Sequence, residues 1–210
     1  MDVIVPFDAI EPKSRLSPRL STDERTALAE AMARDVLGAI RDTGHQPTVL
    51  STASVDFDAP TRVDDRPLTE AVNAVLSSSE ESVAVVMADL ALATPEALQR
   101  VFDAPGDVVL VPGRGGGTNV VLARDPSFRV DYHGVSIRDH REAAAELDVT
   151  EVDSARLSTD IDEPTDLVEV LLHTDGEAAA LLQEWGFAVV SRGGRVGVER
   201  DPEESANETR

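Results

Sequence analysis

The chain has 210 residues, a formal net charge of -21 and a pI near 4.4, yet 41% of its residues are apolar. That apolar share is too high for a disordered acidic chain, so we expect a folded protein with an acidic surface. The charge leaves little room for the basic face that nucleic acids or anionic membranes require. The absence of cysteine excludes disulfides, thiolate metal sites and cysteine nucleophiles.

The acidic surplus and the shortage of lysine look like an adaptation to a salt-rich cytoplasm. At about 1 M salt the Debye length is only about 3 Å, so repulsion between surface carboxylates is screened. No apolar run approaches the roughly 20 residues that span a bilayer, and the first residues lack a cationic signal region. We therefore expect a cytoplasmic protein without membrane or nucleic-acid partners.

Hydrophobic patterns, caps and turn residues predict strands alternating with helices. Strands are expected at residues 3–7, 46–51, 82–88, 107–112, 120–123, 149–152, 187–191 and 195–199. Helices are expected at residues 22–42, 67–78, 95–102, 136–147, 163–173 and 177–185. Residues 1–200 are expected to form a single domain, and residues 201–210 a charged, disordered tail.

Local signals set several of these boundaries. Ser21 and Glu24 form a capping-box pattern, Thr94 precedes an N1 proline, Ser136 is expected to cap the next helix, and Pro164 to open another. The alternation predicts an α/β fold with a mainly parallel sheet, which binds ligands at the carboxyl ends of its strands. Three loops fall at such ends: those containing Lys13, Asp89 and the glycine run 113–119.

Lys13 is the one lysine beside 18 arginines. A compact ammonium on a flexible stem suits phosphate oxygens that change geometry during a reaction, and a guanidinium does not replace it. Lys13 is therefore a functional candidate. The alternative is a lysine that persisted by chance on a solvated loop.

Two acidic segments are candidates for a Mg²⁺ site. Asp89 follows the buried strand 82–88, and Asp160 and Asp162 lie in an acid-rich stretch before a helix. Mg²⁺ commonly takes one or two carboxylates together with substrate phosphate oxygens. The alternatives are that Asp89 caps a turn and that the later carboxylates stabilise the helix dipole, and for these later carboxylates the local pattern alone favours the helix start.

Two further segments are candidates for anion binding. The run 113–119 has no Walker lysine, but its glycines let backbone N–H groups approach an anion, beside the donors Thr118 and Asn119. A surface hairpin is the alternative. Ser136 lies at an expected helix N-terminus, another place that favours anions. The four histidines lack paired zinc spacing and are expected to be structural.

The order of these segments resembles the 2-phospho-L-lactate guanylyltransferase family of coenzyme F420 biosynthesis over nearly the whole chain. The matching stretches are residues 5–7 with 12–17, 87–90, 114–119, 132–140, 160–164 and 166–167. The stretches Lys13–Ser17 and Arg114–Asn119 are the most specific to the family. The resemblance implies a Rossmann-like nucleotidyltransferase of the glycosyltransferase-A-like architecture, and commonly a homodimer.

The resemblance also implies roles for individual residues. The phosphate of 2-phospho-L-lactate would attack the α-phosphorus of GTP, forming lactyl-2-diphospho-5'-guanosine and releasing pyrophosphate. Pro6, Lys13 and Arg15 would bind the nucleotide, and Lys13, Arg15 and Asp89 would serve catalysis. Asp89, Asp160 and Asp162 would hold Mg²⁺, and the acceptor acid would be held by Thr118, Gly134 and Ser136.

Two positions depart from the family pattern. Asp8 stands where the family commonly has a lysine, and Ala91 stands where a proline usually follows the metal aspartate. A missing cation at position 8 requires replacement by an arginine or weakens one phosphate contact. The sequence leaves open phosphoenolpyruvate or another phosphorylated acceptor, ATP in place of GTP, and a nucleotide-binding regulator without turnover.

Overall fold

The computed structural model describes residues 1–201, and the expected tail at 202–210 lies outside them. The strands are β1 (Asp2–Phe7), β2 (Pro47–Ser51), β3 (Thr61–Val63), β4 (Val83–Val86), β5 (Val108–Pro112), β6 (Thr118–Ala123), β7 (Val149–Glu151), β8 (Phe187–Arg192) and β9 (Arg195–Arg200). The α-helices are α1 (Thr22–Asp42), α2 (Leu68–Ser78), α3 (Pro95–Phe102), α4 (Ser136–Ala143), α5 (Leu167–His173) and α6 (Glu177–Glu184). A short 3-10 helix covers Ser14–Leu16.

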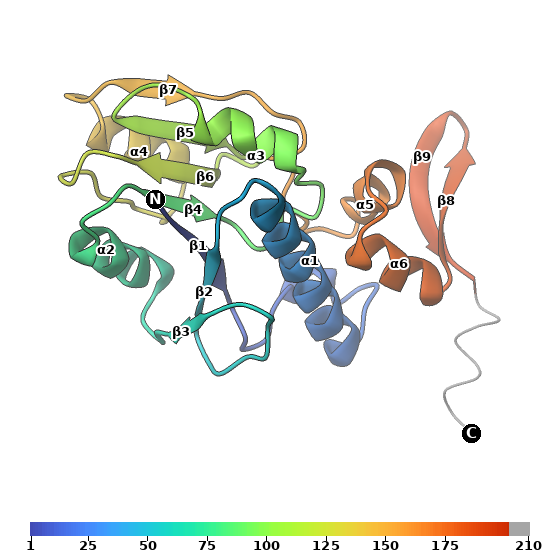
Figure 1. The fold of residues 1–210 in the computed structure, drawn as a ribbon. Helices are drawn as coiled ribbons and strands as arrows, with labels where there is room; N and C mark the ends of the chain where they lie inside the picture. The colour runs from blue at the N-terminus through green and yellow to red at the C-terminus, as the bar shows by residue number, and fades with distance from the viewer. Residues whose placement is uncertain (202–210) are drawn as a thin grey trace.

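Seven strands form one sheet in the order β3-β2-β1-β4-β6-β5-β7 (Figure 1). All neighbours are parallel except those of β6, which runs antiparallel to both β4 and β5. The four residues of β4 are all buried, as its unbroken valine-rich run predicts for a strand covered on both faces. The expected α/β fold with a mainly parallel sheet is confirmed.

Helices cover both faces of this sheet. The core on one face joins Val36 of α1 and Leu98 of α3 to Val86 of β4. The core on the other face joins Val72 of α2 and Ile137 of α4 to the sheet. The alternation of strand side chains separates the two cores, because successive residues of a strand point to opposite faces.

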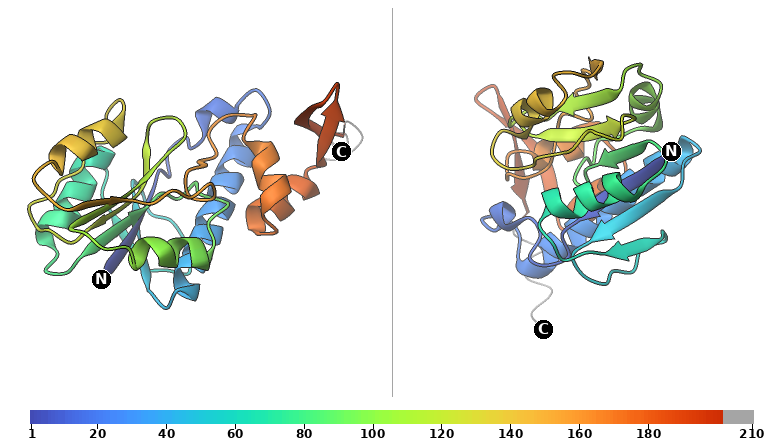
Figure 2. Two further views of the ribbon diagram at one scale, coloured as in Figure 1. Left: turned by 90° about the horizontal axis from the view of Figure 1, so that it is seen from above. Right: turned by 90° about the vertical axis from the view of Figure 1, so that its left-hand side faces the viewer.

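A third core lies beyond α1, at the C-terminal end of the chain. There α5, α6 and the β8–β9 hairpin pack against buried side chains of α1 such as Leu28 and Met32. Figure 2 shows α1 between the sheet and this group, with the hairpin projecting on the far side. Arg200 of β9 pairs with Glu24 of α1 at 2.7 Å and ties the hairpin to the long helix.

Local capping signals predicted the starts of some helices correctly and of others wrongly. The capping box of Ser21 and Glu24 is present, and Thr94 caps α3 as expected. Ser136 was expected to cap α4, but it is the first helical residue, and Val135 occupies the cap without a side-chain bond. The expectation that Pro164 opens a helix is wrong, because residues 163–166 form a turn and α5 begins at Leu167.

Between the expected strand at 46–51 and the expected helix at 67–78, the structure adds the edge strand β3, whose three residues are all exposed. It forms by pairing with β2, so no local hydrophobic pattern marks it. Within residues 1–201 no helix is both long and apolar enough to cross a membrane.

Candidate active site

Lys13 lies after β1, in a loop with an unusual backbone. Glu11 and Lys13 have φ angles of 56° and 55°, in the left-handed region that non-glycine residues seldom adopt. The carbonyl of Lys13 accepts a bond from the Leu16 N–H, and the fully buried Leu16 anchors this turn. The loop thus fixes the backbone from which the Lys13 side chain extends toward the carboxyl ends of the central strands.

The Lys13 ammonium bridges two carboxylates from distant parts of the chain. Its Nζ lies 2.6 Å from Asp89 Oδ2 and 2.7 Å from Asp162 Oδ1. The Lys13 side chain is only 11% exposed, and Arg15 adds a contact of 3.2 Å to Asp162. The structure therefore brings together four of the predicted residues: Lys13, Arg15, Asp89 and Asp162.

Burial and charge act on Lys13 in opposite directions. Removal from water lowers the pKa of the ammonium, but the attraction of Asp89 and Asp162 outweighs this effect. The pKa of Lys13 is therefore raised above its ordinary value, and the side chain stays charged at neutral pH.

Asp89 and Asp162 are positioned by backbone hydrogen bonds. The carbonyl of Asp89 accepts a bond of 3.2 Å from the Ile161 N–H, which joins the two acidic segments. Asp166 accepts bonds from the N–H groups of Asp162 and Glu163 and so fixes the turn that presents Asp162. The expected stabilisation of a helix start here is replaced by a turn that Asp166 holds.

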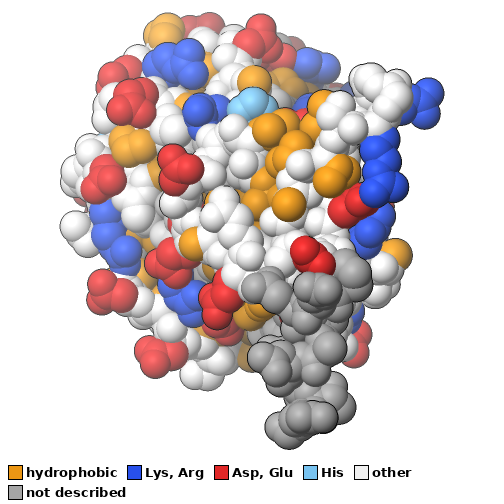
Figure 3. Space-filling model, turned by 90° about the vertical axis from the view of Figure 1, so that its right-hand side faces the viewer, with side chains coloured by type: hydrophobic (Ala, Val, Ile, Leu, Met, Phe, Trp, Pro, Cys, Tyr) orange, Lys and Arg blue, Asp and Glu red, His pale blue; other side chains and the backbone are white. Residues whose placement is uncertain are grey.

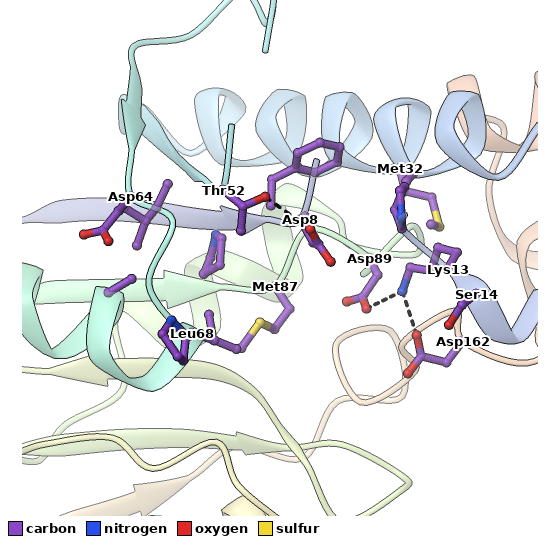
Figure 4. A pocket seen from close by; sticks show the side chains of 18 of the residues that line it. Asp8, Lys13, Ser14, Met32, Thr52, Asp64, Leu68, Met87, Asp89 and Asp162 are labelled. Atoms are coloured by element: carbon purple, nitrogen blue, oxygen red, sulfur yellow. Dashed lines mark hydrogen bonds and ion pairs between the residues drawn. The ribbon is translucent and has the colours of Figure 1, made fainter. Parts of the chain in front are cut away.

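These residues line a cavity of about 710 Å³ (Figure 4). One end carries Lys13, Arg15, Asp89 and Asp162, and Met87 lies between this end and the other. The other end carries the apolar Leu68 together with Asp64, which is paired with Arg66, and the lining of the cavity also includes the apolar Pro6, Leu50, Pro67 and Ala71. A ligand with an apolar plane and a charged tail fits this lining, and the volume is in the range of small-molecule sites.

The donor set fits a divalent cation. Asp89 Oδ1 is buried and has no hydrogen-bond partner among the described residues, an expensive state for a carboxylate oxygen unless a cation satisfies it. Five carboxylates line the cavity against three cationic side chains, so a polyphosphate needs added positive charge to bind there. No three acidic or histidine side chains within residues 1–201 form a complete metal cluster.

Asp160 does not face the cavity. Its Oδ1 accepts a bond of 3.2 Å from Asn119, whose amide also donates to the Leu157 carbonyl. Asn119, expected as an anion donor, is thus engaged within the protein. Gly113 has no room for a side chain, because a Cβ there would lie 2.4 Å from Asn119 Oδ1.

The glycine run is the turn of the β5–β6 hairpin, closed by a bond from the Gly113 N–H to the Gly117 carbonyl. Thr118 and Ser136 lie side by side beyond it, with their hydroxyl oxygens 3.3 Å apart, and both are buried. Gly134, two residues before Ser136, has a φ of 62°. None of the three residues expected to bind the acceptor lines the Lys13 cavity.

His140 contacts the Thr118 hydroxyl of this pair, although no sequence pattern marks it for this place. Its Nδ1 lies 2.8 Å from Thr118 Oγ1, and its Nε2 accepts a bond from the Asp131 N–H. Because Nε2 is an acceptor, a neutral ring carries its proton on Nδ1 and donates to Thr118. The pKa of His140 is lowered to about 4 because burial disfavours the charged ring.

The two departures from the family pattern have local explanations. Asp8 Oδ1 accepts bonds from the Ile10 N–H and the Thr52 hydroxyl, so the carboxylate supports the loop after β1. Ala91 is buried, and its neighbours Leu90 and Leu92 are buried as well. Packing thus restrains the loop after Asp89 where a proline is absent.

Comparisons with known proteins agree with this geometry. The family model described as "Guanylyl transferase CofC like" matches residues 1–200. The chain is 59% identical to the 2-phospho-L-lactate guanylyltransferase of Halomicrobium mukohataei, over 95% of this chain and 100% of that protein. It is 54% identical to the protein of the same name from Haloarcula marismortui, over 95% of this chain and 99% of that protein.

Solved structures of low identity share the fold. A nucleotidyl transferase from Methanothermobacter thermautotrophicus has a TM-score of 0.57 at 13% identity and covers 80% of this chain and 95% of its own. Molybdopterin-guanine dinucleotide biosynthesis protein A from Archaeoglobus fulgidus has a TM-score of 0.52 at 14% identity, over 81% of this chain and 96% of its own. The nucleotidyltransferase architecture is confirmed. The matched family model and the similar full-length relatives show that this chain belongs to the CofC-like guanylyl transferase family.

Proposed function

We propose that this protein transfers a guanylyl group from GTP to 2-phospho-L-lactate, giving lactyl-2-diphospho-5'-guanosine and pyrophosphate. The observation that carries the proposal is the convergence of Lys13, Asp89 and Asp162 at one end of a cavity, in a chain similar to proteins of this name over 95% of its length. We infer that it works in the salt-rich cytoplasm that its acidic surface suits.

In this reaction an acceptor phosphate oxygen forms a bond to the α-phosphorus as the bond to the β-phosphate oxygen breaks. The protein contributes alignment and charge stabilisation, without a covalent intermediate. Lys13 and Arg15 bind the triphosphate, and the apolar lining of the cavity, with Pro6, holds the nucleoside. Arg66 also lines the cavity, but its guanidinium is paired with Asp64, so Asp8 leaves the cavity with one free cation fewer than the family pattern.

Asp89 and Asp162 are the residues that would hold Mg²⁺, and Asp160 stabilises their segment through Asn119. Bound Mg²⁺ would supply Lewis acidity and neutralise phosphate charge. The unpartnered Oδ1 of Asp89 and the surplus of carboxylates in the cavity support this assignment.

For the acceptor acid we propose Thr118, Gly134 and Ser136. The two hydroxyl groups are close together, and the left-handed Gly134 lets the chain turn sharply just before α4. Thr118→Val should raise the KM for 2-phospho-L-lactate and leave the KM for GTP unchanged. An unchanged KM for the acid in a folded variant would remove Thr118 from the acceptor site.

Pyrophosphate release in molar KCl tests the reaction. We expect release with GTP, Mg²⁺ and 2-phospho-L-lactate, and less with ATP or with phosphoenolpyruvate. No release by protein whose circular dichroism shows a folded state would contradict the proposal. Faster release with phosphoenolpyruvate would show that this acid is the preferred acceptor, and the proposed guanylyl transfer from GTP would still hold.

Asp89→Asn tests the metal assignment. Loss of one negative charge should raise the Mg²⁺ concentration for half-maximal activity on the order of tenfold or more. Asp42→Asn, at the exposed end of α1, is the matched control and should titrate like the wild type. Identical Mg²⁺ titrations for all three proteins would exclude Asp89 from the metal site.

We also propose a homodimer formed through the β8–β9 hairpin. Figure 3 shows apolar side chains gathered on the face that carries the hairpin, where Leu172, Val189 and Val196 are exposed. Light scattering in molar KCl should give twice the chain mass of 22.4 kDa. Val196→Glu should give the monomer mass, whereas Val63→Glu, at an equally exposed valine of β3, should not. A monomeric wild type at all concentrations would contradict the dimer.

A further inference from the structure

The contact of Lys13 with Asp89 and Asp162 bears on the order in which a cation and the nucleotide can bind. Asp89 and Asp162 direct one oxygen each at the Lys13 ammonium, at 2.6 and 2.7 Å. An ion held by both carboxylates has to lie between them, where the ammonium now lies. Even if a divalent cation used the free Oδ1 of Asp89, it would lie beside the ammonium, and the repulsion between the two positive charges disfavours binding both here.

Features of the loop allow the ammonium to leave without unfolding the protein. The backbone at residue 13 is held by the 3-10 turn and by the buried Leu16, whereas the lysine stem has four rotatable carbons. The left-handed conformations of Glu11 and Lys13 show that this loop is strained, as segments with a functional constraint often are. Arg15 is 66% exposed and does not enclose the ammonium.

We propose that Lys13 occupies the cation position in the nucleotide-free protein and gives it up only when a triphosphate attracts the ammonium. This inference rests on the proposed function, which places the triphosphate and the metal at this end of the cavity. Metal and nucleotide then bind cooperatively: each raises the affinity for the other by the same factor. The lysine prevents a divalent cation from occupying the carboxylates before the nucleotide arrives.

Direct Mn²⁺ binding without nucleotide tests the exclusion. Free Mn²⁺ is counted by electron paramagnetic resonance in molar KCl, which screens the acidic surface. Lys13→Met keeps a side chain of similar length but removes the ammonium, and should bind one Mn²⁺ at least tenfold more tightly than the wild type. The double variant with Asp89→Asn should lose that gain.

Arg15→Met is the matched control for charge. It also removes a positive charge beside Asp162, but it leaves the ammonium between the carboxylates, so its Mn²⁺ affinity should change less than threefold. Equal affinities of the wild type and a folded Lys13→Met would overturn the proposal. An equal gain in Arg15→Met would overturn it too, because general electrostatics would then explain the effect.

The single lysine allows the movement to be observed directly. Protein labelled with ¹³C at lysine Cε has one lysine signal by NMR, that of Lys13. GTP without metal should shift this signal, and millimolar Mg²⁺ without nucleotide should not. A shift with Mg²⁺ alone, or none with GTP, would contradict the exclusion. Pyrophosphate release alongside equal Mn²⁺ affinities would reject this inference and leave the proposed function intact.

Discussion

At the scale of single residues, the role proposed for Lys13 requires a lysine and not an arginine. Lys13→Arg preserves the positive charge and the attraction to Asp89 and Asp162, so the variant should fold normally. A planar guanidinium is larger and presents its donors in a fixed fork. It should therefore adjust poorly to phosphate oxygens that change position during the reaction. We expect pyrophosphate release to fall by about tenfold or more, an order of magnitude set by about 1.4 kcal/mol of lost transition-state stabilisation.

Arg19→Lys is the control for this exchange, because Arg19 is exposed a few residues further along the chain. It should release pyrophosphate at the wild-type rate. If Lys13→Arg turned over within twofold of the wild type, Lys13 would be only a structural cation.

The buried His140 predicts a loss of stability in acid. Its pKa is lowered to about 4 because burial disfavours the charged ring, against the opposing attraction of Asp131 and Asp139. In the unfolded chain the pKa returns to about 6.5, so acid protonates the unfolded state first. As the pH falls from about 6.5 to about 4, the native state should lose about 3 kcal/mol from this group, with no further loss below.

Urea denaturation of the wild type and of His140→Gln, in constant KCl and at several pH values, checks this loss of stability. The quantity compared is the free energy of unfolding. The advantage of the wild type at pH 7 should shrink toward pH 4, because only the histidine titrates. A constant difference between the two proteins over that range would show that His140 is not a titrating core residue.

At the scale of elements, α6 depends on a carboxylate from α1. Asp35 accepts bonds of 2.7 and 3.0 Å from the N–H groups of Glu177 and Ala178, and so caps α6 from another helix. Asp35→Ala should lower the free energy of unfolding by about 1–2 kcal/mol, the usual cost of losing a helix cap. Asp42→Ala removes an equal charge from the exposed end of α1 and should cost less than about 0.5 kcal/mol in the same urea experiment. Equal losses in both variants would contradict this role of Asp35.

The same helix shows why sequence reasoning finds some caps and misses others. Ser21 and Thr94 bond to N–H groups three residues away, so their patterns are visible locally. Asp35 caps a helix more than 140 residues further along the chain, and only the packing of α1 against α6 creates that contact. Ser136 fails as a predicted cap for the same reason, because its hydroxyl bonds to Thr118 across the fold.

In the candidate site, too, the sequence predicts some residues correctly and leaves others unresolved. Lys13 and Asp89 were predictable because both follow buried strands, and parallel strands bring their carboxyl ends to one edge. The sequence could not separate Asp160 from Asp162, which are two residues apart in an irregular segment. The fold directs Asp162 to Lys13 and Asp160 to Asn119.

At the scale of the whole molecule, the net charge of -21 predicts that salt stabilises the fold. Raising KCl from 0.1 to 2 M shortens the Debye length from about 10 Å to below 3 Å and screens repulsion among the carboxylates. We expect the midpoint of thermal unfolding, followed by circular dichroism, to rise by about 10 °C or more. A midpoint that falls with KCl would show that surface ion pairs outweigh the repulsion.

The contact of Lys13 with Asp162 joins positions 149 residues apart. The ribosome therefore releases the lysine loop and most of the sheet long before the second carboxylate has been synthesised. Because domains begin to fold as they emerge, a growing chain should form the Lys13 cavity without one wall. Any nascent or truncated product that stops before Asp162 carries the ammonium with Asp89 alone, so only a polypeptide that extends past this residue has all three charged side chains.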